Sequence, residues 1–441
     1  MNQSDNIAAP ASAVGGAVTV IRLSGPEVLN IANTVWQGRT PLSAANARKM
    51  LLGKVAGDPT LAVYMKAPFS YTGDDVVELQ CHGGAAAAAS AMKMLLSAGC
   101  RLAEPGEFTY RAFVNGKLDL LQAEAVADII SSGSQAALEL AEKQLAGTLS
   151  ARVDRLWDDV ATLRSECESR LDFPDEELDF DNSVPEKIAG CVAEIVSLLE
   201  SGAAGSIIRD GVRVVLAGRP NAGKSSLLNC ILGFDRAIVS AIPGTTRDTV
   251  ESDAAIRNVP VKLTDTAGLR ESSDPVEKLG IERSFRSIRA GEVTFWLLDA
   301  AADDPEAEAA SIDRNAPGVV AVWNKCDLVP GKKLPETGLP QVEISAKNGA
   351  NLDKLFDAFE KQLFGNGRQG NPEVALNART SSLLEKARAA LLRAAEAFEA
   401  EDFELAALEL AQGGKYIGEI TGRSVEPDLL DKIFHRFCIG K

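Results

Sequence analysis

The segment VRVVLAGRPNAGKSSLLNCILG, residues 212–233, decides the fold of the central part of this chain. It begins with an apolar run of the kind found in strands buried inside a parallel sheet. The stretch from Gly218 to Ser226 fits the pattern G-x-x-x-x-G-K-[ST], and SLLNCILG supplies the helix that should follow. In this context successive backbone amides wrap phosphate groups, Lys224 reaches the terminal phosphates, and the Ser225 hydroxyl can bind Mg²⁺. The segment therefore predicts a nucleotide-binding loop.

Two later motifs indicate which nucleotide is bound. NKCD, Asn324 to Asp327, ends an apolar strand. A carboxylate there can accept hydrogen bonds from N1–H and the exocyclic amine of guanine, a pair of donors that adenine does not offer. SAK, Ser345 to Lys347, can present a backbone N–H to the guanine oxygen. Each motif is weak alone, but together and in this order they predict specificity for GTP.

Two further motifs predict a switch that responds to the γ-phosphate. DTAG, which begins at Asp265, again ends a strand, so this carboxylate can hold Mg²⁺ through water while the Gly268 amide meets the γ-phosphate. GTTRD, residues 244–248, supplies Thr246 as a second hydroxyl for the metal. Together these parts indicate a protein whose conformation changes with GTP.

One catalytic part is missing from the sequence. Leu269 stands where Ras-type enzymes carry a glutamine that positions water, and a leucine side chain cannot orient a nucleophile. Another side chain, a partner's arginine or a second cation must then complete the site. Asn221, inside the phosphate loop, could hold a monovalent ion against the phosphates, or it could only shape the loop.

The sequence on either side of the loop predicts several domains. Residues 17–80 contain short strand patterns, and an Ala-rich helix follows His82, which indicates an α+β module. From about residue 118 the apolar spacing is helical, and SGAAGS, residues 201–206, resembles a flexible link. Strand and helix patterns then alternate to about residue 366, as in a doubly wound domain, before helical spacing resumes. The simplest arrangement is an α/β domain inserted into a helical one.

Composition narrows the class of protein. The chain has 441 residues, more than one hydrophobic core usually supports. Its seven cysteines form no paired framework, which favours reduced thiols in a cytoplasmic protein, and two histidines argue against a His-rich metal site. We expect no secretory signal and no membrane association, because no apolar run approaches the roughly 18 residues of a spanning helix. The net charge of −16 argues against an unspecific nucleic-acid coat but allows a local basic patch.

Three stretches outside the nucleotide motifs carry a family resemblance. FSYTGDDVVELQCHGG, PGEFTYRAFVNGKLDLLQAEAVADII and the terminal FCIGK resemble signatures of the MnmE (TrmE) family of tRNA-modification GTPases, and the resemblance covers nearly the whole chain. It implies a multi-domain α/β and α fold: an N-terminal α+β tetrahydrofolate-binding-like and dimerisation domain, a helical domain, and an inserted Ras-like doubly wound P-loop GTPase domain. The predicted boundaries are 1–117 for the first, 118–210 and 367–441 for the two parts of the second, and 211–366 for the third.

The resemblance also implies a potassium-stimulated GTPase that forms a homodimer and whose GTPase domains pair across the nucleotide. Lys224 and Glu277 are then catalytic, the glutamate orienting the attacking water, whereas from the residues alone Glu277 would be a solvated helix position. Ser225 and Thr246 would bind Mg²⁺, and Asn221, Ser240, Ile242 and Thr245 would surround K⁺. The implied GTP-binding set is Asn221, Ala222, Gly223, Lys224, Ser225, Ser226, Thr245, Thr246, Asp265, Thr266, Gly268, Asn324, Lys325, Asp327, Ser345, Ala346 and Lys347.

The family acts with MnmG (GidA), a partner that uses FAD and NADH. It takes part in 5-carboxymethylaminomethyl modification of the wobble uridine of certain tRNAs, and a tetrahydrofolate derivative supplies the one-carbon unit. Residues that match the folate site are Arg22, Glu78, Lys117 and Lys441, whose charges suit the amino-pyrimidine edge and the carboxylates of a folate. Surface ion pairing is the alternative for any one of them taken singly.

Cys438 allows two interpretations. A last helix from Asp428 would place Leu430, Phe434, Phe437 and Cys438 on one face, which predicts a buried thiol. The residues after the cysteine do not suit a prenylation box. The resemblance implies a functional, catalytic cysteine close to the folate site, and both interpretations remain open at this stage.

A rival function is a ribosome-assembly GTPase switch of the Era or Der type, which modifies nothing. Such proteins share the nucleotide motifs but usually append an RNA-binding module such as a KH domain with its GXXG loop. No clear candidate for that module follows the GTPase region. A third alternative is an oligomerising scaffold whose GTP cycle only changes its shape.

Overall fold

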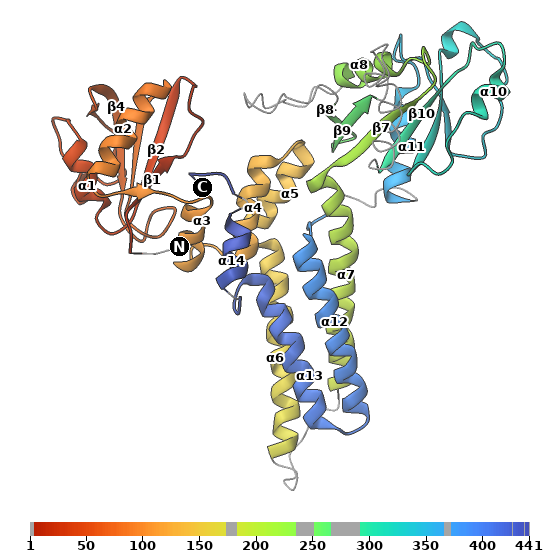
Figure 1. The fold of residues 1–441 in the computed structure, drawn as a ribbon. Helices are drawn as coiled ribbons and strands as arrows, with labels where there is room; N and C mark the ends of the chain where they lie inside the picture. Colours follow the sequence, from red (N-terminus) through yellow and green to blue (C-terminus); the bar gives the residue numbers. More distant parts are fainter. Residues whose placement is uncertain are drawn as a thin grey trace, which may run out of the picture. The chain divides into compact units, whose positions relative to one another are not determined.

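The computed structural model describes residues 4–172, 183–234, 251–265, 292–365, 372–425, 427–435 and 437–440. Contacts between residues divide the chain into two compact units. Unit 1 comprises Met1–Ala127, Leu145–Val192 and Leu383–Lys441, and unit 2 comprises Asp128–Gln144 and Ala193–Ser382. Figure 1 shows the elements of both along the chain.

A six-stranded sheet of order β3-β4-β5-β2-β1-β6 forms the N-terminal part of unit 1. Burial alternates along β4 and β5 because successive side chains of a strand point to opposite faces of the sheet. Helices α1 and α2 contact the sheet and enclose a core that includes Ile21, Leu79 and Leu95. The bounds are β1 Ile7–Pro10, β2 Val18–Ser24, α1 Val28–Val35, β3 Leu51–Val55, β4 Asp58–Met65, β5 Val76–His82, α2 Ala85–Ser97, β6 Arg101–Leu102 and α3 Glu107–Val114, with a 3-10 helix at Ala44–Asn46.

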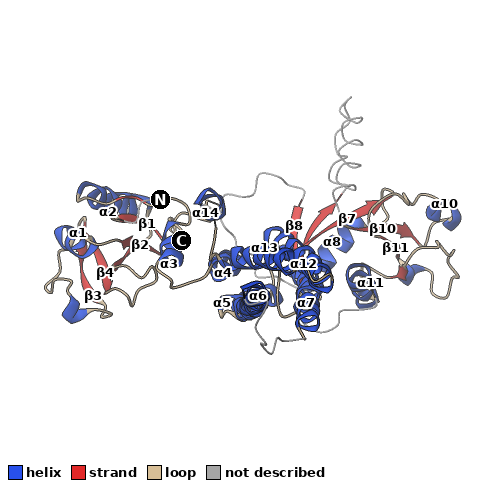
Figure 2. Cartoon of the chain, turned by 90° about the horizontal axis from the view of Figure 1, so that it is seen from below, coloured by secondary structure: helices blue, strands red, loops and turns tan. Residues whose placement is uncertain are grey.

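Long helices follow the first sheet. Helices α6 and α13, both in unit 1, pack along each other and are seen adjacent and nearly end-on in Figure 2. Helix α12 has one apolar face, at helical spacing, whose residues are all buried: Leu383, Ala387, Ala390, Leu391, Ala394 and Phe398. The bounds are α4 Leu120–Ser131, α5 Gln135–Leu145, α6 Thr148–Asp172, α7 Val184–Asp210, α12 Ala378–Glu399, α13 Phe403–Thr421 and α14 Pro427–Phe434.

Two details of the helical prediction were wrong. SGAAGS is not a link but part of α7. Its glycines allow close packing, since a Cβ on Gly202 would lie 2.2 Å from the Leu376 side chain and one on Gly205 would lie 2.0 Å from the Val374 carbonyl oxygen. The helical spacing that begins at about residue 118 suggested one long helix, but residues 120–145 form two helices, α4 and α5. Glycine is therefore a packing residue in the first case, and local composition alone could not indicate this.

A second six-stranded sheet, of order β12-β11-β10-β7-β9-β8, forms the core of unit 2. All its pairs are parallel except β8 with β9. Strands β10 and β11 are buried along nearly their whole length because apolar clusters cover both faces of the sheet. The bounds are β7 Val212–Gly218, α8 Lys224–Phe234, β8 Glu251–Ile256, β9 Val259–Asp265, β10 Val293–Asp299, α10 Pro305–Ala309, β11 Val319–Asn324, β12 Gln341–Glu343 and α11 Leu352–Phe364, with a 3-10 helix at Cys326–Leu328.

The expected fold class is confirmed: an α+β part, helices and a doubly wound α/β domain occur in one chain. The short strands β1 and β6 were not anticipated. The expectation that nothing in the chain resembles a membrane span fails for α7, which is long and apolar enough to cross a membrane by length and composition. Core helices of soluble proteins pass the same test, so this is weak support for a span.

Candidate functional site

The phosphate-binding loop connects β7 to α8 and is shaped by two glycines that no other residue could replace. Gly218 has φ +132°, and a Cβ there would lie 2.3 Å from the Leu297 carbonyl oxygen. Gly223 has φ +99°, and a Cβ there would lie 2.1 Å from Asn324 Nδ2. Asn221 between them is also left-handed, at φ +63°, and is exposed. The loop can therefore pass close to two neighbouring strands.

Two side chains at the end of the loop, Lys224 and Ser225, are held by hydrogen bonds within the domain. Lys224 is buried, and its Nζ donates to the carbonyl oxygens of Gly218 and Arg219 at 3.0 and 2.8 Å. Ser225 Oγ donates to Asp265 Oδ2 at 2.9 Å, so the hydroxyl of the loop and the carboxylate that ends β9 converge. A hydroxyl in the first turn of α8 and a carboxylate at the end of β9 are hard oxygen donors of the kind that suit Mg²⁺. Ser226 is exposed on the first turn of α8.

Asn324 joins three of the predicted motifs. Its side chain is 2% exposed; Nδ2 donates to the carbonyl oxygen of Ala222 at 2.8 Å, and Oδ1 accepts from the backbone N–H of Ala346 at 2.9 Å. The same amide thus fixes the phosphate loop to the SAK segment. A buried polar side chain with both ends satisfied holds one geometry, because any displacement leaves a buried group unpaired.

The remaining guanine-motif residues surround this amide. Lys325 has φ +66°, and its Nζ lies 2.6 Å from Asp299 Oδ2. Asp327 and Lys347 are exposed, so both side chains can meet a ligand. The Ser345 hydroxyl is buried without a hydrogen-bond partner among the described residues. An orphaned buried hydroxyl beside this loop suits a site that gains polar contacts when a nucleotide binds.

A clamp that the sequence did not predict holds the loop from its other side. The carboxylate of Glu308, 6% exposed, accepts from Arg219 Nη1 at 2.9 Å and from the backbone N–H of Asp299 at 3.2 Å. Arg219 Nη2 also donates to the Ala307 carbonyl oxygen at 2.9 Å. Arg219 occupies a variable position of the loop pattern, and Glu308 lies in no motif. Glu308 can therefore be identified only in the structure, as a buried carboxylate.

In unit 1, two of the predicted folate-site residues face each other. Arg22 on β2 is in register with Glu78 on β5, and Nε lies 2.9 Å from Oε1. The guanidinium also lies over the rings of Tyr71 and Phe108, at 5.2 and 5.7 Å from their centroids. Burial raises the pKa of the Tyr71 hydroxyl, which makes a 2.9 Å hydrogen bond with the Thr109 hydroxyl. The pair is thus a half-buried polar group with aromatic walls.

The other two residues predicted for that site are Lys117, which the structure describes, and Lys441, which it does not. Lys117 is exposed, and its Nζ donates to the Pro68 carbonyl oxygen at 3.1 Å. Lys441 lies outside the described residues. Its neighbour Gly440 packs against β1, since a Cβ there would lie 2.0 Å from the Pro10 carbonyl oxygen. The end of the chain therefore lies against the strand that pairs with the strand of Arg22.

Cys438 is exposed, and the interpretation of a buried thiol was wrong. Helix α14 ends at Phe434 rather than continuing through residue 438, so the cysteine leaves the apolar face that Phe434 and Phe437 occupy in the core. Its carbonyl oxygen accepts from the Gly106 N–H at 3.4 Å. This contact holds the segment beside the start of α3.

Several predicted site residues lie outside the described residues, so their placement stays a prediction. They include both switch threonines, most of the potassium set, and the residue expected to orient water: Ser240, Ile242, Thr245, Thr246, Thr266, Gly268 and Glu277.

Comparisons with known proteins agree with the domain content. Residues 6–117 match the profile of the GTP-binding protein TrmE N-terminus, and residues 120–438 match that of the MnmE helical domain. The tRNA modification GTPase MnmE of Natranaerobius thermophilus is 38% identical over 99% of this chain and 99% of its own length. That of Synechococcus sp. (strain JA-3-3Ab) is 41% identical over 99% of this chain and 98% of its own.

Among solved structures, the G domain of the FeoB iron transporter of T. maritima is 25% identical and covers 34% of this chain and 98% of its own, with a TM-score of 0.26. The helical-domain profile alone spans most of the chain, and the curated relatives match from end to end. This chain therefore belongs to the MnmE family of tRNA modification GTPases.

Proposed function

We propose that this chain binds GTP with Mg²⁺ at the carboxyl ends of β7, β9 and β11 and hydrolyses it in the service of tRNA modification. The observation that carries the proposal is the side-chain amide of Asn324, which bonds to Ala222 of the phosphate loop and to Ala346 of the SAK segment. One side chain therefore fixes both the loop expected to bind the phosphates and the segment expected to bind the guanine base. The strand ends of a doubly wound sheet are where such ligands bind.

Residues for the metal fit its chemistry. Ser225 Oγ and Asp265 Oδ2, 2.9 Å apart, are oxygen donors of the type Mg²⁺ prefers. Ser225 and Asp265 would hold the metal, which would supply positive charge against the negative charge that develops during phosphoryl transfer. Lys224 would turn from the loop carbonyls toward the terminal phosphates, and Thr246 would complete the metal site.

For the chemistry of hydrolysis we propose the potassium mechanism of the family. Asn221 supports it, because an exposed amide in a left-handed loop position can turn its oxygen toward a cation beside the phosphates. Ser240, Ile242 and Thr245 would complete the potassium site, Glu277 would orient the attacking water, and pairing of two GTPase domains in a homodimer would close the site. These residues replace the glutamine that Leu269 cannot mimic.

The test of this mechanism compares GTP hydrolysis in KCl and NaCl at equal ionic strength. We expect the rate to be much higher in KCl, Asn221→Ala to lose that advantage, and Glu277→Ala to lose hydrolysis while nucleotide affinity is kept. Exposed Lys347→Gln serves as a control for affinity, since it should weaken GTP binding without altering the ratio of rates in the two salts. Equal wild-type rates in both salts would refute the potassium mechanism.

For the modification itself we propose that the chain acts with an MnmG-type partner, which supplies FAD and NADH, on the wobble uridine of a set of tRNAs. A tetrahydrofolate derivative would bind at Arg22 and Glu78, with Lys117, Lys441 and Cys438 close by. Support comes from the half-buried ion pair between aromatic rings and from the end of the chain lying against β1. The carboxylate suits the donor edge of a pterin, and the guanidinium suits a carboxylate.

Nucleoside analysis of tRNA from cells that lack this protein separates the proposed function from a ribosome-assembly switch. Loss of the modified wobble uridine is the expected result, and an unchanged uridine would reject the modification role. Calorimetric titration with 5-formyltetrahydrofolate tests the folate site. We expect Glu78→Gln to weaken binding strongly, whereas Glu27→Gln, a change of the same charge at an exposed position, should not.

A further inference from the structure

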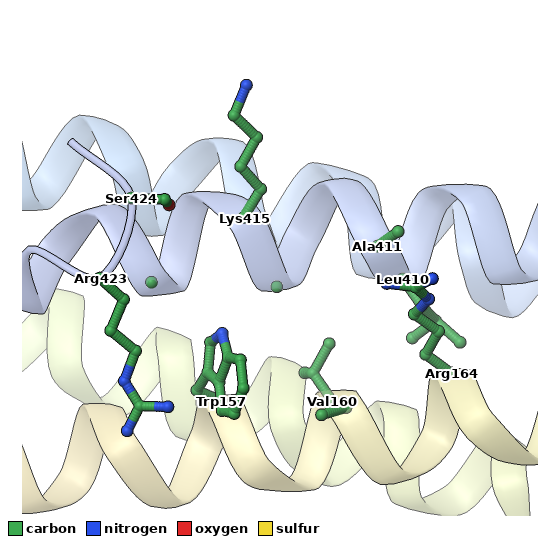
Figure 3. Close-up of a pocket in the computed structure, with 11 residues that line it drawn as sticks. Trp157, Val160, Arg164, Leu410, Ala411, Lys415, Arg423 and Ser424 are labelled. Carbon is green, nitrogen blue, oxygen red and sulfur yellow. The ribbon is translucent and has the colours of Figure 1, made fainter. Parts of the chain in front are cut away.

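A cavity of about 310 Å³ lies between α6 and α13, entirely within unit 1 and separate from both sites described above. Figure 3 shows Trp157, Val160 and Arg164 rising from α6, with Leu410, Ala411 and Lys415 on α13 opposite them. Its volume is at the lower end of the range for small-ligand pockets, about 300 Å³ upward. The cavity therefore has room for one planar ring with its attached groups, not for a helix.

The charge of the cavity is opposite to that of the whole chain. Arg164, Lys415 and Arg423 line it, and no acidic residue does, although the chain carries a net charge of −16. Arg423 pairs with Asp154 at 2.8 Å, and Arg164 pairs with the carboxylate of Glu168 at 2.7 Å. These exposed ion pairs are worth little and are screened by salt, so a ligand phosphate can compete for the guanidinium groups.

Lys415 is the exposed cation of the cavity that remains available. It makes no hydrogen bond or ion pair with any described residue, and Figure 3 shows its side chain extending from α13 on the side away from α6, so its ammonium lies at the rim rather than inside the cavity. A lysine of this kind is a mobile point charge, which suits contact with a phosphate group.

Trp157 gives the cavity an aromatic wall. Its ring is half-buried, and the Arg423 guanidinium lies 4.2 Å from its centroid. No described residue accepts from its Nε1–H, which faces Gly418: a Cβ added there would lie 3.3 Å from this nitrogen. The other tryptophans of the chain, Trp36, Trp296 and Trp323, are at most 8% exposed. Trp157 is thus the tryptophan placed to stack with a ligand.

Glycines on α13 keep the cavity open. Gly414 and Gly418 lie one turn apart on the side that faces α6, and glycine in a helix interior is less stable than alanine. Packing does not require glycine at the first position, since a Cβ on Gly414 would meet only Val160 at an ordinary 3.7 Å. A side chain longer than a methyl group at this position would extend into the space beside Val160 that the cavity occupies.

We propose that this cavity binds a nucleotide of a single-stranded RNA segment, with the base against Trp157 and its phosphate at Arg423 or Arg164, while Lys415 at the rim contacts a neighbouring phosphate of the strand. Cations combined with an aromatic ring that accepts any base are how proteins hold single strands. The proposal rests on the proposed function in one respect, because the RNA segment is taken to belong to the tRNA that is modified. The cavity lies far in sequence from the GTP-binding motifs and would give the chain a separate surface that holds the tRNA.

The test uses the full chain with an unmodified tRNA transcript and, separately, a single-stranded heptanucleotide. Tryptophan fluorescence should be quenched on binding, and Trp157→Phe should abolish the quenching while retaining most of the affinity measured by anisotropy. Trp157→Ala should weaken binding by roughly tenfold or more. Lys415→Gln should weaken it and reduce the slope of log affinity against log salt by about 1. Gly414→Leu, which fills the cavity without changing charge, should also weaken binding.

The matched control is Lys93→Gln, which removes an exposed lysine on α2 that does not line the cavity. Affinities of Lys415→Gln and Gly414→Leu equal to those of the wild type would overturn the proposal, even if the tRNA is still modified in cells. If these variants bind RNA more weakly but the wobble uridine is unchanged in cells that lack the protein, the RNA site is supported and the proposed role in tRNA modification is rejected. If a polyglutamate peptide binds the cavity and RNA does not, a protein partner occupies it and the RNA proposal falls.

Discussion

Loss of the carboxylate of Glu308 should weaken GTP binding although this residue lies in no nucleotide motif. The side chain is 6% exposed and accepts two hydrogen bonds, from Arg219 at 2.9 Å and from the backbone N–H of Asp299 at 3.2 Å. A hydrogen bond to a charged group contributes about 1.5–3 kcal/mol. The side chain of Arg219 is 49% exposed, so solvent reduces this to about 1 kcal/mol.

That energy sets the size of the expected effect. If the clamp holds the phosphate loop in its binding conformation, its loss can raise the dissociation constant for GTP by at most about fivefold, the equivalent of about 1 kcal/mol. Glu308→Gln keeps the shape of the side chain and one acceptor, and Arg219→Gln removes the other partner. Fluorescent GTP analogues give the dissociation constants, and thermal unfolding shows whether the domain remains folded.

A double-mutant cycle decides whether Arg219 acts through Glu308. The double variant should bind GTP as weakly as either single variant, because both remove the same interaction. Arg257→Gln is the matched control: it breaks an ion pair of 2.8 Å with Asp357 elsewhere in the domain and should leave GTP affinity unchanged. Additive losses from Arg219→Gln and Glu308→Gln would refute the clamp and assign each residue a separate effect.

Three further predictions follow from buried or exposed groups. Glu107→Gln should lower the free energy of unfolding of the N-terminal part at pH 7 by about 3 kcal/mol, because this fully buried carboxylate lies 2.6 Å from the Arg101 guanidinium. Burial raises the pKa of Glu107, but the hydrogen bonds and charge of Arg101 outweigh this effect and lower the pKa. The stabilisation by this ion pair is therefore fully present above about pH 4.5 and is lost as the pH falls through the lowered pKa, which denaturant melts at several pH values can measure. Gly205→Val should destabilise the helical part by more than about 2 kcal/mol in the same assay, since a Cβ collides with the Val374 carbonyl; an unchanged midpoint would refute the packing argument. Maleimide should label Cys438 first at pH 7.5, and a fast phase that persists in Cys438→Ser would contradict its exposure.

Much of the fold could be predicted from the sequence where a property is local. The strand before the phosphate loop extends over Val212–Gly218, as the apolar run predicted, and the face of α12 follows from apolar spacing alone. The phosphate loop needs a fixed order of glycines, a lysine and a serine within nine residues, so its chemistry can be recognised without coordinates. The family resemblance extended this to the domain content.

The tertiary structure decided what depends on residues far apart in sequence. Arg219 and Glu308 are separated by 89 positions, and no local pattern links them. SGAAGS looked like a linker, yet it is helical, and its glycines let the segment at residues 374–376 pack closely against α7, which composition alone does not indicate. The cavity at Trp157 likewise exists only where α6 meets α13. Sequence determines local conformation through steric and hydrogen-bonding preferences, whereas sites of this kind arise from long-range packing, which fixes which distant side chains share a space.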